Sequence, residues 1–262
     1  MGSMVATVPG AQAIARAAAV LRRVTAAGTT GVTTQDIAQH TELTRPTAHR
    51  LLTALQAEGL VDREDATGLW LPGPELYLMG TVAASRYDVP ALAHNIVKSL
   101  ATRTEESAFL SVQRGDETVC LLREDGSFPI RSFVLSEGVR FPLGVASAGL
   151  VILSFLPDDE IDAYLERQTK LSEHFGRPHS VTAIRKRIQE TRDRGYSVNP
   201  GLIVNGSYGL GAAVFNAQGR PEWALSITGV GFRFGPDRLP RLGRDLLSHA
   251  HQLTAALAAS GR

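Results

Sequence analysis

The sequence predicts an α+β protein with two domains, and three observations support that prediction. Residues 14–57 carry apolar residues at helical spacing, as in a small helical domain. Pro72-Gly73-Pro74 then interrupts the chain, because proline cannot continue a helix or a central strand. Beyond this break, strand-like and helix-like segments follow one another towards the C-terminus. We therefore expect domains at residues 5–73 and 89–260, joined by a linker helix at residues 74–88.

Residues 43–57 predict the second helix of a helix-turn-helix. Their apolar side chains fall on one stripe, and the opposite face carries two arginines and a histidine but no acid. Pro46 suits the first turn, and Thr44 is the expected N-cap. Such a helix can dock in the major groove of DNA, whereas the alternative is an ordinary surface helix that is basic by chance. The contacts we expect to bases or phosphates come from Thr44, Arg45, Thr47, His49 and Arg50.

The neighbouring segments predict a winged form of this motif. Apolar spacing from Ile14 to Val24 predicts a first helix of the domain. Thr33 or Thr34 can cap the next helix, which holds Ile37 and Ala38 and precedes residues 43–57. After the recognition helix, two short strands around a glycine-containing turn predict a hairpin wing. Arg63 is the DNA contact expected from this wing.

The tip of the wing is acidic. Glu64 and Asp65 would repel phosphates, so we expect most of the affinity to come from the recognition helix. An edge hairpin without any DNA contact is the alternative.

Composition limits the class of protein. The chain has 262 residues, 44% hydrophobic and 20% charged, which is typical of a globular protein. Its net charge of +1 gives no general attraction to nucleic acid, so the DNA prediction depends on local arginines. Cys120 is the single cysteine, which excludes a disulfide framework and a cysteine-rich metal site. The apolar run at residues 145–156 is too short to span a membrane, so we expect a cytoplasmic protein without a cofactor.

The C-terminal part is expected to be an antiparallel sheet with helices on its faces. Residues 75–86 predict the linker helix, and Val89-Pro90 marks the entry to the larger domain. The expected strands lie at residues 107–113, 118–124, 209–216 and 222–229, and the helices lie around residues 92–100, 150, 161–165, 184–194 and 242–257.

These segments, in this order, resemble the IclR family of bacterial transcriptional regulators over nearly the whole chain. The resemblance is carried by LTRPTAHRLLTALQAEGLVDRE, FPLGVASAGLVILSFLPDDEIDAYL, RGYSVNPGLIVNGSYGLGAAVFNAQGR and ALSITG. It implies a winged helix-turn-helix, a linker helix and a GAF-like effector-binding domain. It also implies a homodimer or a dimer of dimers on a palindromic operator, with a small-molecule effector.

The resemblance also implies an effector pocket, and the residue types are consistent with one. The helix that opens at residues 147–149 has free N–H groups that favour an oxygen-rich group. Two hydroxyls alternate on one strand face, and two apolar residues would form the walls. The alternative is that these are small core residues. The expected contacts are Ile130, Phe133, Ser147, Ala148, Gly149, Asn199, Gly209, Ser226 and Thr228.

Three departures from the family pattern remove charge from this region. Gly144 stands where a histidine is common, Leu150 where a lysine is usual, and Asn199-Pro200-Gly201 where an acidic run is usual. These changes argue against a small, highly charged keto acid. They favour a larger and more apolar effector, such as an aromatic acid or its neutral derivative.

An enzyme is the rival class, and no catalytic constellation supports it. Gly206-Ser207-Tyr208-Gly209 lacks the spacing of a nucleophile elbow, and Gly229-Val230-Gly231 lacks that of a dinucleotide loop. Cys120 between apolar neighbours is expected to be a buried strand cysteine. The histidine pairs 174/179 and 249/251 lack zinc spacing, so we interpret them as surface residues. A third class, with a purely structural C-terminal domain, would need no polar pocket.

Overall fold

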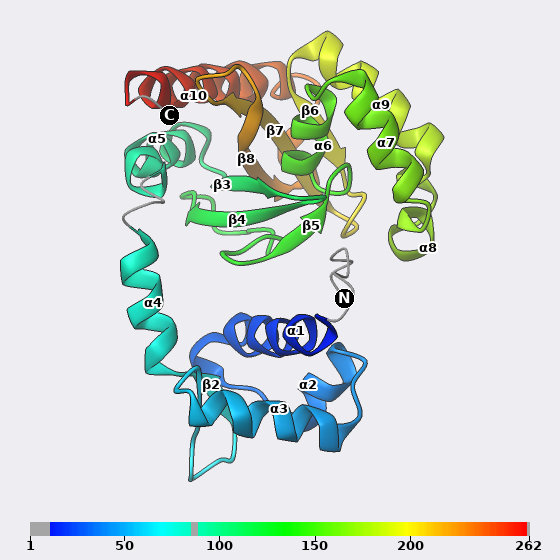
Figure 1. The fold of residues 1–262 in the computed structure, drawn as a ribbon. Coiled ribbons are helices and arrows are strands. Elements are labelled where there is room, and N and C mark those ends of the chain that lie inside the picture. Colours follow the sequence, from blue (N-terminus) through cyan, green and yellow to red (C-terminus); the bar gives the residue numbers. More distant parts are fainter. Residues whose placement is uncertain (1–10, 85–88, 261–262) are drawn as a thin grey trace. The chain divides into compact units, whose positions relative to one another are not determined.

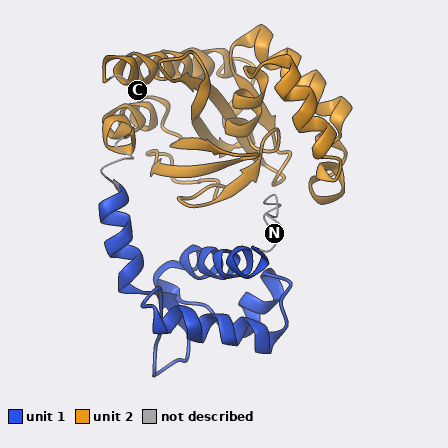
Figure 2. Cartoon of the chain, in the orientation of Figure 1, with its two compact units in different colours: residues 1–87 blue, residues 88–262 orange. Residues whose placement is uncertain are grey.

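The computed structural model describes residues 11–84 and 89–260, and the chain forms two compact units (Figures 1 and 2). Unit 1 spans residues 1–87 and unit 2 spans residues 88–262. The predicted end of the linker helix, at residues 85–88, lies outside the described residues. No helix within the described ranges is long and apolar enough to cross a membrane.

Unit 1 is a winged helix-turn-helix, as the sequence predicts. Its helices α1, α2 and α3 are followed by a hairpin of β1 and β2 and by helix α4 (Figure 1). Val20, Ile37, Leu52 and Trp70 form its core together with smaller apolar residues. Ile14 does not join this core, because it lies on the exposed side of α1. The elements are α1 (Gln12–Ala26), α2 (Thr34–His40), α3 (Arg45–Ala57), β1 (Val61–Arg63), β2 (Trp70–Pro72) and α4 (Pro74–Ala84).

The helix starts of unit 1 show which capping predictions hold. Thr33 caps α2, because its side-chain oxygen accepts a 3.1 Å hydrogen bond from the Asp36 backbone N–H. Thr44 occupies the N-cap position of α3 with extended backbone, but its hydroxyl does not cap the helix. Instead, the Thr44 and Thr47 hydroxyl oxygens lie 2.9 Å apart and share a hydrogen bond. The start of α3 therefore relies on backbone conformation and on Pro46 in its first turn.

The wing is fixed where the chain enters and leaves it. Val61 pairs with Pro72 and Arg63 with Trp70 in the antiparallel hairpin. Gly73 follows directly, and a Cβ atom there would lie 2.2 Å from the Gly59 carbonyl oxygen. Only glycine allows this approach, so the break predicted at Pro72-Gly73-Pro74 also anchors the base of the wing.

Unit 2 is built on one antiparallel sheet with the strand order β5-β4-β3-β8-β7-β6 (Figure 1). The predicted strands correspond to β3 (Ser107–Arg114), β4 (Glu117–Glu124), β7 (Ser207–Phe215) and β8 (Pro221–Val230). The two edge strands, β5 (Arg140–Pro142) and β6 (Ser197–Pro200), were not predicted. Each is too short for apolar and polar residues to alternate, and each ends in a proline that an edge tolerates.

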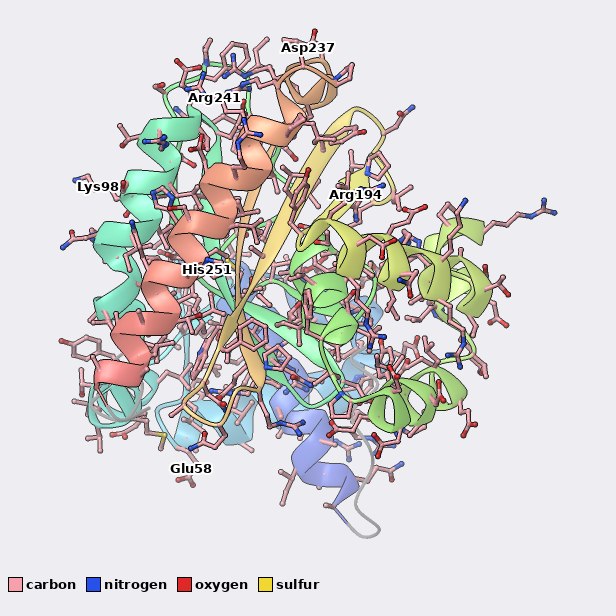
Figure 3. All side chains as sticks on the ribbon, turned by 90° about the horizontal axis from the view of Figure 1, so that it is seen from above. Glu58, Lys98, Arg194, Asp237, Arg241 and His251 are labelled. Carbon is pink, nitrogen blue, oxygen red and sulfur yellow. The ribbon has the colours of Figure 1, made fainter. Side chains whose placement is uncertain are left out.

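Helices cover both faces of this sheet. On one face, α5 and α10 lie side by side over a core that includes Leu110 and Leu246 (Figure 3). On the other, α6, α7 and α9 enclose Phe109, Ile152 and Tyr164. Neighbouring residues of β3 therefore serve opposite cores, as the pleat requires. The helices are α5 (Val89–Thr104), α6 (Ser147–Ser154), α7 (Asp158–Arg167), the short α8 (Leu171–Phe175), α9 (Val181–Arg194) and α10 (Leu239–Ala259).

A buried ion cluster ties the start of β3 to the segment before α10. The Glu106 side chain is 2% exposed and accepts hydrogen bonds from Arg233 at 2.5 Å and from Arg238 at 2.6 Å. Arg238 also donates to the Thr104 carbonyl oxygen. Neighbouring Glu105 pairs with the same Arg233 at 2.8 Å, but its side chain is 57% exposed. The two adjacent carboxylates thus share a partner and differ in burial.

This difference predicts unequal effects of the same substitution. Glu106→Gln should lower the free energy of unfolding by about 3 kcal/mol, because it removes the buried carboxylate that Arg233 and Arg238 share and leaves them with the solvent-exposed Glu105. Glu105→Gln is the matched control and should change stability little, because solvent screens an exposed pair. Urea unfolding of both variants measures the difference. Equal effects would show that the buried cluster does not hold the two segments together.

Candidate functional site

The outward face of α3 presents the side chains that the sequence predicts for DNA contact. Thr44, Arg45, His49 and Arg50 are exposed and Thr47 is partly exposed. Ala48, Leu52 and Leu55 on the opposite side are buried and hold the helix against α1 and α2. No acidic side chain of the described residues lies within ion-pair distance of Arg45 or Arg50. The two guanidinium groups are therefore available to an external anion or base edge.

Trp70 is a buried residue that contacts several side chains of this surface, and the sequence analysis did not single it out. Its indole N–H donates a 2.9 Å hydrogen bond to the Thr34 hydroxyl. The His49 ring meets the indole edge-on with 6.4 Å between centroids, and the Arg63 guanidinium carbon lies 5.6 Å from the indole centroid. One buried aromatic ring thus contacts the start of α2, the outward face of α3 and the wing. Its signal in the sequence was its place in an apolar strand, which predicts burial but not these contacts.

The two acidic residues at the wing tip, Glu64 and Asp65, differ in their contacts. Glu64 closes the turn, because the Thr67 hydroxyl donates to its carboxylate at 2.5 Å and its backbone N–H donates to the Leu69 carbonyl oxygen at 2.9 Å. Asp65 is exposed. Glu64 therefore has a structural task in the turn in addition to any effect on phosphates.

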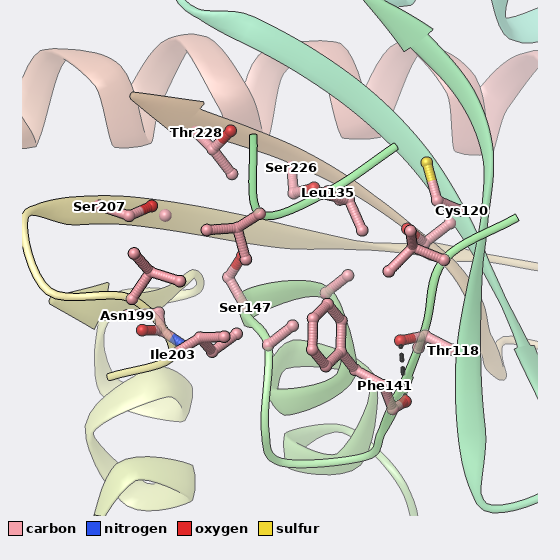
Figure 4. Close-up of a pocket in the computed structure, with 17 residues that line it drawn as sticks. Thr118, Cys120, Leu135, Phe141, Ser147, Asn199, Ile203, Ser207, Ser226 and Thr228 are labelled. Atoms are coloured by element: carbon pink, nitrogen blue, oxygen red, sulfur yellow. Dashed lines mark hydrogen bonds between the residues drawn. The ribbon is translucent and has the colours of Figure 1, made fainter. Parts of the chain in front are cut away.

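Unit 2 contains a cavity between the sheet and the start of α6 (Figure 4). About 500 Å³ of unoccupied space, counted to its mouth, lies among its seventeen lining residues. This figure includes space that is open to solvent, and the part that water-sized groups can occupy is about 30 Å³. The lining residues are Ser111, Thr118, Cys120, Val134, Leu135, Val139, Phe141, Ala146, Ser147, Ala148, Asn199, Ile203, Val204, Ser207, Gly209, Ser226 and Thr228.

Two residues of β8 that line this cavity have buried hydroxyls without a partner. The Ser226 and Thr228 side-chain oxygens are inaccessible to solvent and have no hydrogen-bond partner in the structure. Both residues line the cavity, and because they are two apart on a strand they share one face of the sheet (Figure 4). An unmade hydrogen bond at a buried hydroxyl costs about 1–3 kcal/mol. A ligand that offers oxygen acceptors would recover that cost.

The start of α6 is held against the sheet by side chains of β6. The Ser197 hydroxyl donates to the Ser147 carbonyl oxygen at 2.7 Å, and the Asn199 amide donates to the Val145 carbonyl oxygen at 2.8 Å. The Asn199 side-chain oxygen accepts from the Leu202 backbone N–H at 3.0 Å. Asn199 therefore lines the cavity with both of its polar atoms already engaged. Its role in the structure is to position α6.

Glycines on β7 allow this close packing. A Cβ atom at Gly211 would lie 2.7 Å from the Ser147 carbonyl oxygen, and one at Gly209 would lie 3.1 Å from the Ser147 hydroxyl. Any larger side chain at Gly211 would push α6 away from the sheet. At its N-cap position α6 has Ala146, whose side chain offers no acceptor. The first N–H groups of α6 are therefore not capped by a side chain, and they lie beside the cavity.

Six of the nine residues predicted for the pocket line this cavity: Ser147, Ala148, Asn199, Gly209, Ser226 and Thr228. Gly149 does not, because it packs on the backbone of Pro142 and Leu143. Whether any of them binds an effector stays a prediction.

Ile130 and Phe133 were expected to be apolar walls, and the structure does not place them there. They are 55% and 77% exposed, and neither lines the cavity. Both lie in residues 125–139, which form no helix or strand, so no periodicity indicates which side chains point inwards. Phe133 turns outwards beneath Arg123, whose guanidinium carbon is 5.5 Å from the ring centroid. The apolar walls come instead from Val134, Leu135, Val139 and Phe141.

Cys120 is a buried strand cysteine that lines the cavity, which the sequence analysis did not foresee for this site. Burial raises the pKa of its thiol to about 12, and the nearby charge of Glu137 acts in the same direction. The thiol is therefore protonated at neutral pH and is a poor nucleophile.

The histidines also lack a catalytic arrangement. His179 and His249 are buried, so our interpretation of them as surface residues was wrong. The His249 ring nitrogens lie 2.7 Å from the Asp245 carbonyl oxygen and 3.2 Å from the Ser99 hydroxyl, between α10 and α5. Desolvation lowers the pKa of His179, which favours its neutral form. Within residues 11–84 and 89–260, no group of His, Cys, Asp or Glu side chains is arranged to hold a metal ion.

Sequence comparisons agree with this division into a DNA-facing unit and a cavity-bearing unit. Residues 13–65 match the IclR helix-turn-helix domain, and residues 81–255 match the family described as bacterial transcriptional regulator IclR C-terminal. The HTH-type transcriptional regulator KipR of Bacillus subtilis is 27% identical over 223 residues, covering 85% of this chain and 88% of that protein. The transcriptional repressor IclR of Escherichia coli is 25% identical over 222 residues, covering 84% and 81%.

Solved structures share the fold. A putative transcriptional regulator from Rhodococcus sp. RHA1 superposes with a TM-score of 0.71 at 28% identity, covering 95% of this chain and 99% of that one. The crystal structure of Thermotoga maritima IclR superposes with a TM-score of 0.68 at 24% identity, covering 94% and 99%. The relatives are transcriptional regulators and not enzymes. The chain therefore belongs to the IclR family and is a DNA-binding transcriptional regulator with a C-terminal effector domain.

Proposed function

We propose that this regulator binds a palindromic operator through α3, and that its affinity for the operator changes when a small organic molecule occupies the cavity of unit 2. In this proposal residues 5–73 bind DNA, residues 74–88 link the domains and residues 89–260 bind the effector. The protein acts in the cytoplasm. The observation that carries the proposal is that Ser226 and Thr228 line the cavity and that their buried hydroxyls have no partner.

The DNA contacts proposed for α3 follow from its exposed face. Arg45 and Arg50 can donate two parallel hydrogen bonds to a guanine edge, and Thr44 and Thr47 lie at the helix start, where phosphates approach. His49 adds a further donor and Arg63 extends the surface onto the wing. The Trp70 ring supports both His49 and Arg63, so these side chains are placed before DNA arrives.

The effector proposed for the cavity is a small organic or aromatic acid, or a derivative of one. Its oxygen would accept hydrogen bonds from Ser226, Thr228 and the N–H groups at the start of α6, where Ser147 and Ala148 lie. Its apolar part would contact Leu135, Val139 and Phe141. A cavity in a purely structural domain would not need two unpartnered hydroxyls.

Communication between the domains is proposed to run through α4, because this helix belongs to the linker of residues 74–88 that connects the two domains. The effector must bind more tightly to one arrangement of the domains than to the other. A coupling free energy of about 1–3 kcal/mol is enough for regulation.

A second copy of the chain is the proposed partner of unit 1. Tyr77, Leu78 and Met79 of α4 and Ile14 of α1 are large apolar side chains exposed on this unit. Large exposed apolar side chains of this kind are typical of interaction sites. A homodimer, or a dimer of such dimers, would bury them and match the two halves of a palindromic operator.

Substitution of Arg50 tests the DNA-binding part. Arg50→Ala should weaken binding to the cognate operator by about 1–3 kcal/mol, because it removes a base contact. Arg50→Lys should lose much of the same affinity, because lysine keeps the charge but not the paired donors. Mobility shifts at fixed salt, with the DNA that flanks the protein's own gene, measure both. The control is Lys98→Ala, which removes an exposed positive charge from unit 2 (Figure 3).

Unchanged operator affinity in a folded Arg50→Ala protein would remove Arg50 from the contact surface. A loss shared equally by Lys98→Ala would show that only total charge matters.

Filling the cavity tests the effector part. Ala148 is buried at the cavity, and Ala148→Trp should abolish the thermal stabilisation that aromatic acids, amides and esters give to the parent protein. Operator affinity should persist, because the winged domain has its own core. Ser226→Ala is a milder companion that should weaken the same ligands without filling the space.

Retained stabilisation in both variants would place the effector elsewhere. Loss of operator binding in Ala148→Trp alone would mark that variant as misfolded, and Ser226→Ala would then decide the question.

A further inference from the structure

We propose that the outer face of α5 and α10 in unit 2 is a docking surface for an acidic helical segment of another protein. The inference uses neither α3 nor the cavity, so it goes beyond the proposed function and stands apart from it. The two helices lie side by side, with Lys98 and Arg241 on this face (Figure 3). Its exposed cations, which we call the basic face, are Lys98, Arg103, Arg241 and Arg244.

The two helices that carry the basic face contain almost no acid. α5 has no Asp or Glu, and α10 has only Asp245. The Asp245 side chain is mostly buried, and the Arg103 guanidinium group donates to it at 2.6 Å. Over the whole chain 27 Lys and Arg residues stand against 26 Asp and Glu residues. The excess of positive charge is therefore a local property of this face.

Two contacts between the helices show how close together these cations lie. Arg103 of α5 pairs with Asp245 of α10, and the Ser99 hydroxyl of α5 lies 3.2 Å from a ring nitrogen of His249 in α10. Ser99 precedes Arg103 whereas His249 follows Asp245, so the two helices run antiparallel. The four cations therefore lie within about nine residues of helix, which is ~14 Å along the axis.

Two of the four cations have no acidic partner. No carboxylate of the described residues lies within ion-pair distance of Lys98 or Arg244. Arg241 is exposed, and its Nε atom lies 3.8 Å from the Asp245 carboxylate. The single buried carboxylate therefore leaves most of the positive charge of the basic face unmatched.

Two exposed acids lie at the end of the basic face. Glu105 follows α5 directly, and Asp237 precedes α10. The pKa of Glu105 is lowered chiefly by its hydrogen bond from Arg233, and Arg241 contributes least to the shift. This end of the face is therefore less positive than the part that holds the unpaired Lys98 and Arg244.

The exposed cations of α9 have a different environment. Arg185 pairs with Asp162 at 2.7 Å, and Lys186 lies 4.0 Å from Glu190. The surface of α9 thus supplies its own carboxylates to its cations. The basic face does not, so an anion from outside meets it without first displacing an internal partner.

The size of the basic face favours an acidic helix over DNA. Duplex DNA binding typically uses about 6–10 phosphate contacts, whereas this face offers four cations, and Asp245 holds one of them. A helix with carboxylates at positions i, i+4 and i+8 presents them on one side over about 12 Å. That length matches the ~14 Å of the basic face. Three of the four cations are arginines, whose guanidinium groups bind carboxylates through paired hydrogen bonds.

Two matched peptides test the recognition of carboxylates. One is an alanine-based helical peptide of about twenty residues with glutamate at every fourth position, and the other has glutamine at those positions. Fluorescence anisotropy at low ionic strength should show that the full-length protein binds the glutamate peptide at least about fivefold more tightly. Added salt should remove the difference. Equal affinities, or no binding of either peptide, would overturn the proposal.

Paired substitutions locate the binding site of the peptide. The double variant Lys98→Gln, Arg244→Gln should weaken the glutamate peptide about fivefold, because it removes two unpaired cations. The matched control is Arg185→Gln, Lys186→Gln, which removes the same charge from α9, where the cations are paired. This control should bind the peptide as the parent protein does. A loss shared equally by both double variants would show that net charge alone attracts the peptide and would contradict the proposal.

DNA is the other anion to be separated from an acidic helix. The double variant Arg45→Gln, Arg50→Gln should still bind the glutamate peptide, because α3 belongs to a different unit. The Lys98→Gln, Arg244→Gln protein should bind the operator as tightly as the parent protein in mobility shifts. Loss of the peptide in the α3 variant would place it on the DNA-binding surface. Loss of operator affinity in a folded Lys98→Gln, Arg244→Gln protein would assign the basic face to DNA, and either result would overturn the proposal.

Discussion

The contact between α6 and the glycine-lined strand β7 is the constraint on which the cavity depends. Gly211 lets the Ser147 backbone approach the sheet, and the Ser197 hydroxyl fixes the Ser147 carbonyl oxygen there. Asn199 holds the preceding turn at Val145. Because the α6 start is fixed in this way, its first residues line the same cavity as Ser226 and Thr228 of β8. The cavity thus arises from packing, without any charged side chain in its wall.

In unit 1 a buried aromatic ring positions the surface side chains, as the glycines of β7 allow α6 to be positioned in unit 2. Trp70 is buried, and it contacts the Thr34 hydroxyl, the His49 ring and the Arg63 guanidinium group. The side chains that would meet DNA are therefore carried on a rigid core rather than on loops. In both units the residues proposed to contact a ligand or DNA depend on others that position them.

The sequence was sufficient where a long pattern was present. The apolar stripe of α3 and the alternation in β3, β4, β7 and β8 predicted those elements, because each spans several turns or pairs. The short edges β5 and β6 were missed, and Ile130 and Phe133 in the irregular segment of residues 125–139 were wrongly expected to form the cavity wall, to which Leu135 contributes instead. Burial of His179 and His249 was also missed, because it depends on tertiary packing that a single polar residue does not reveal.

The central claim is that occupancy of the cavity and binding of the operator are coupled. The most direct measurement is a pair of titrations with the acid, amide or ester that binds most tightly: operator affinity with and without saturating ligand, and ligand affinity with and without operator. Linkage requires both affinities to change by the same factor, and regulation predicts a factor of about 5–150. Ligand binding that is identical with and without operator would contradict the account, because a ligand of equal affinity for both states does not shift the equilibrium between them.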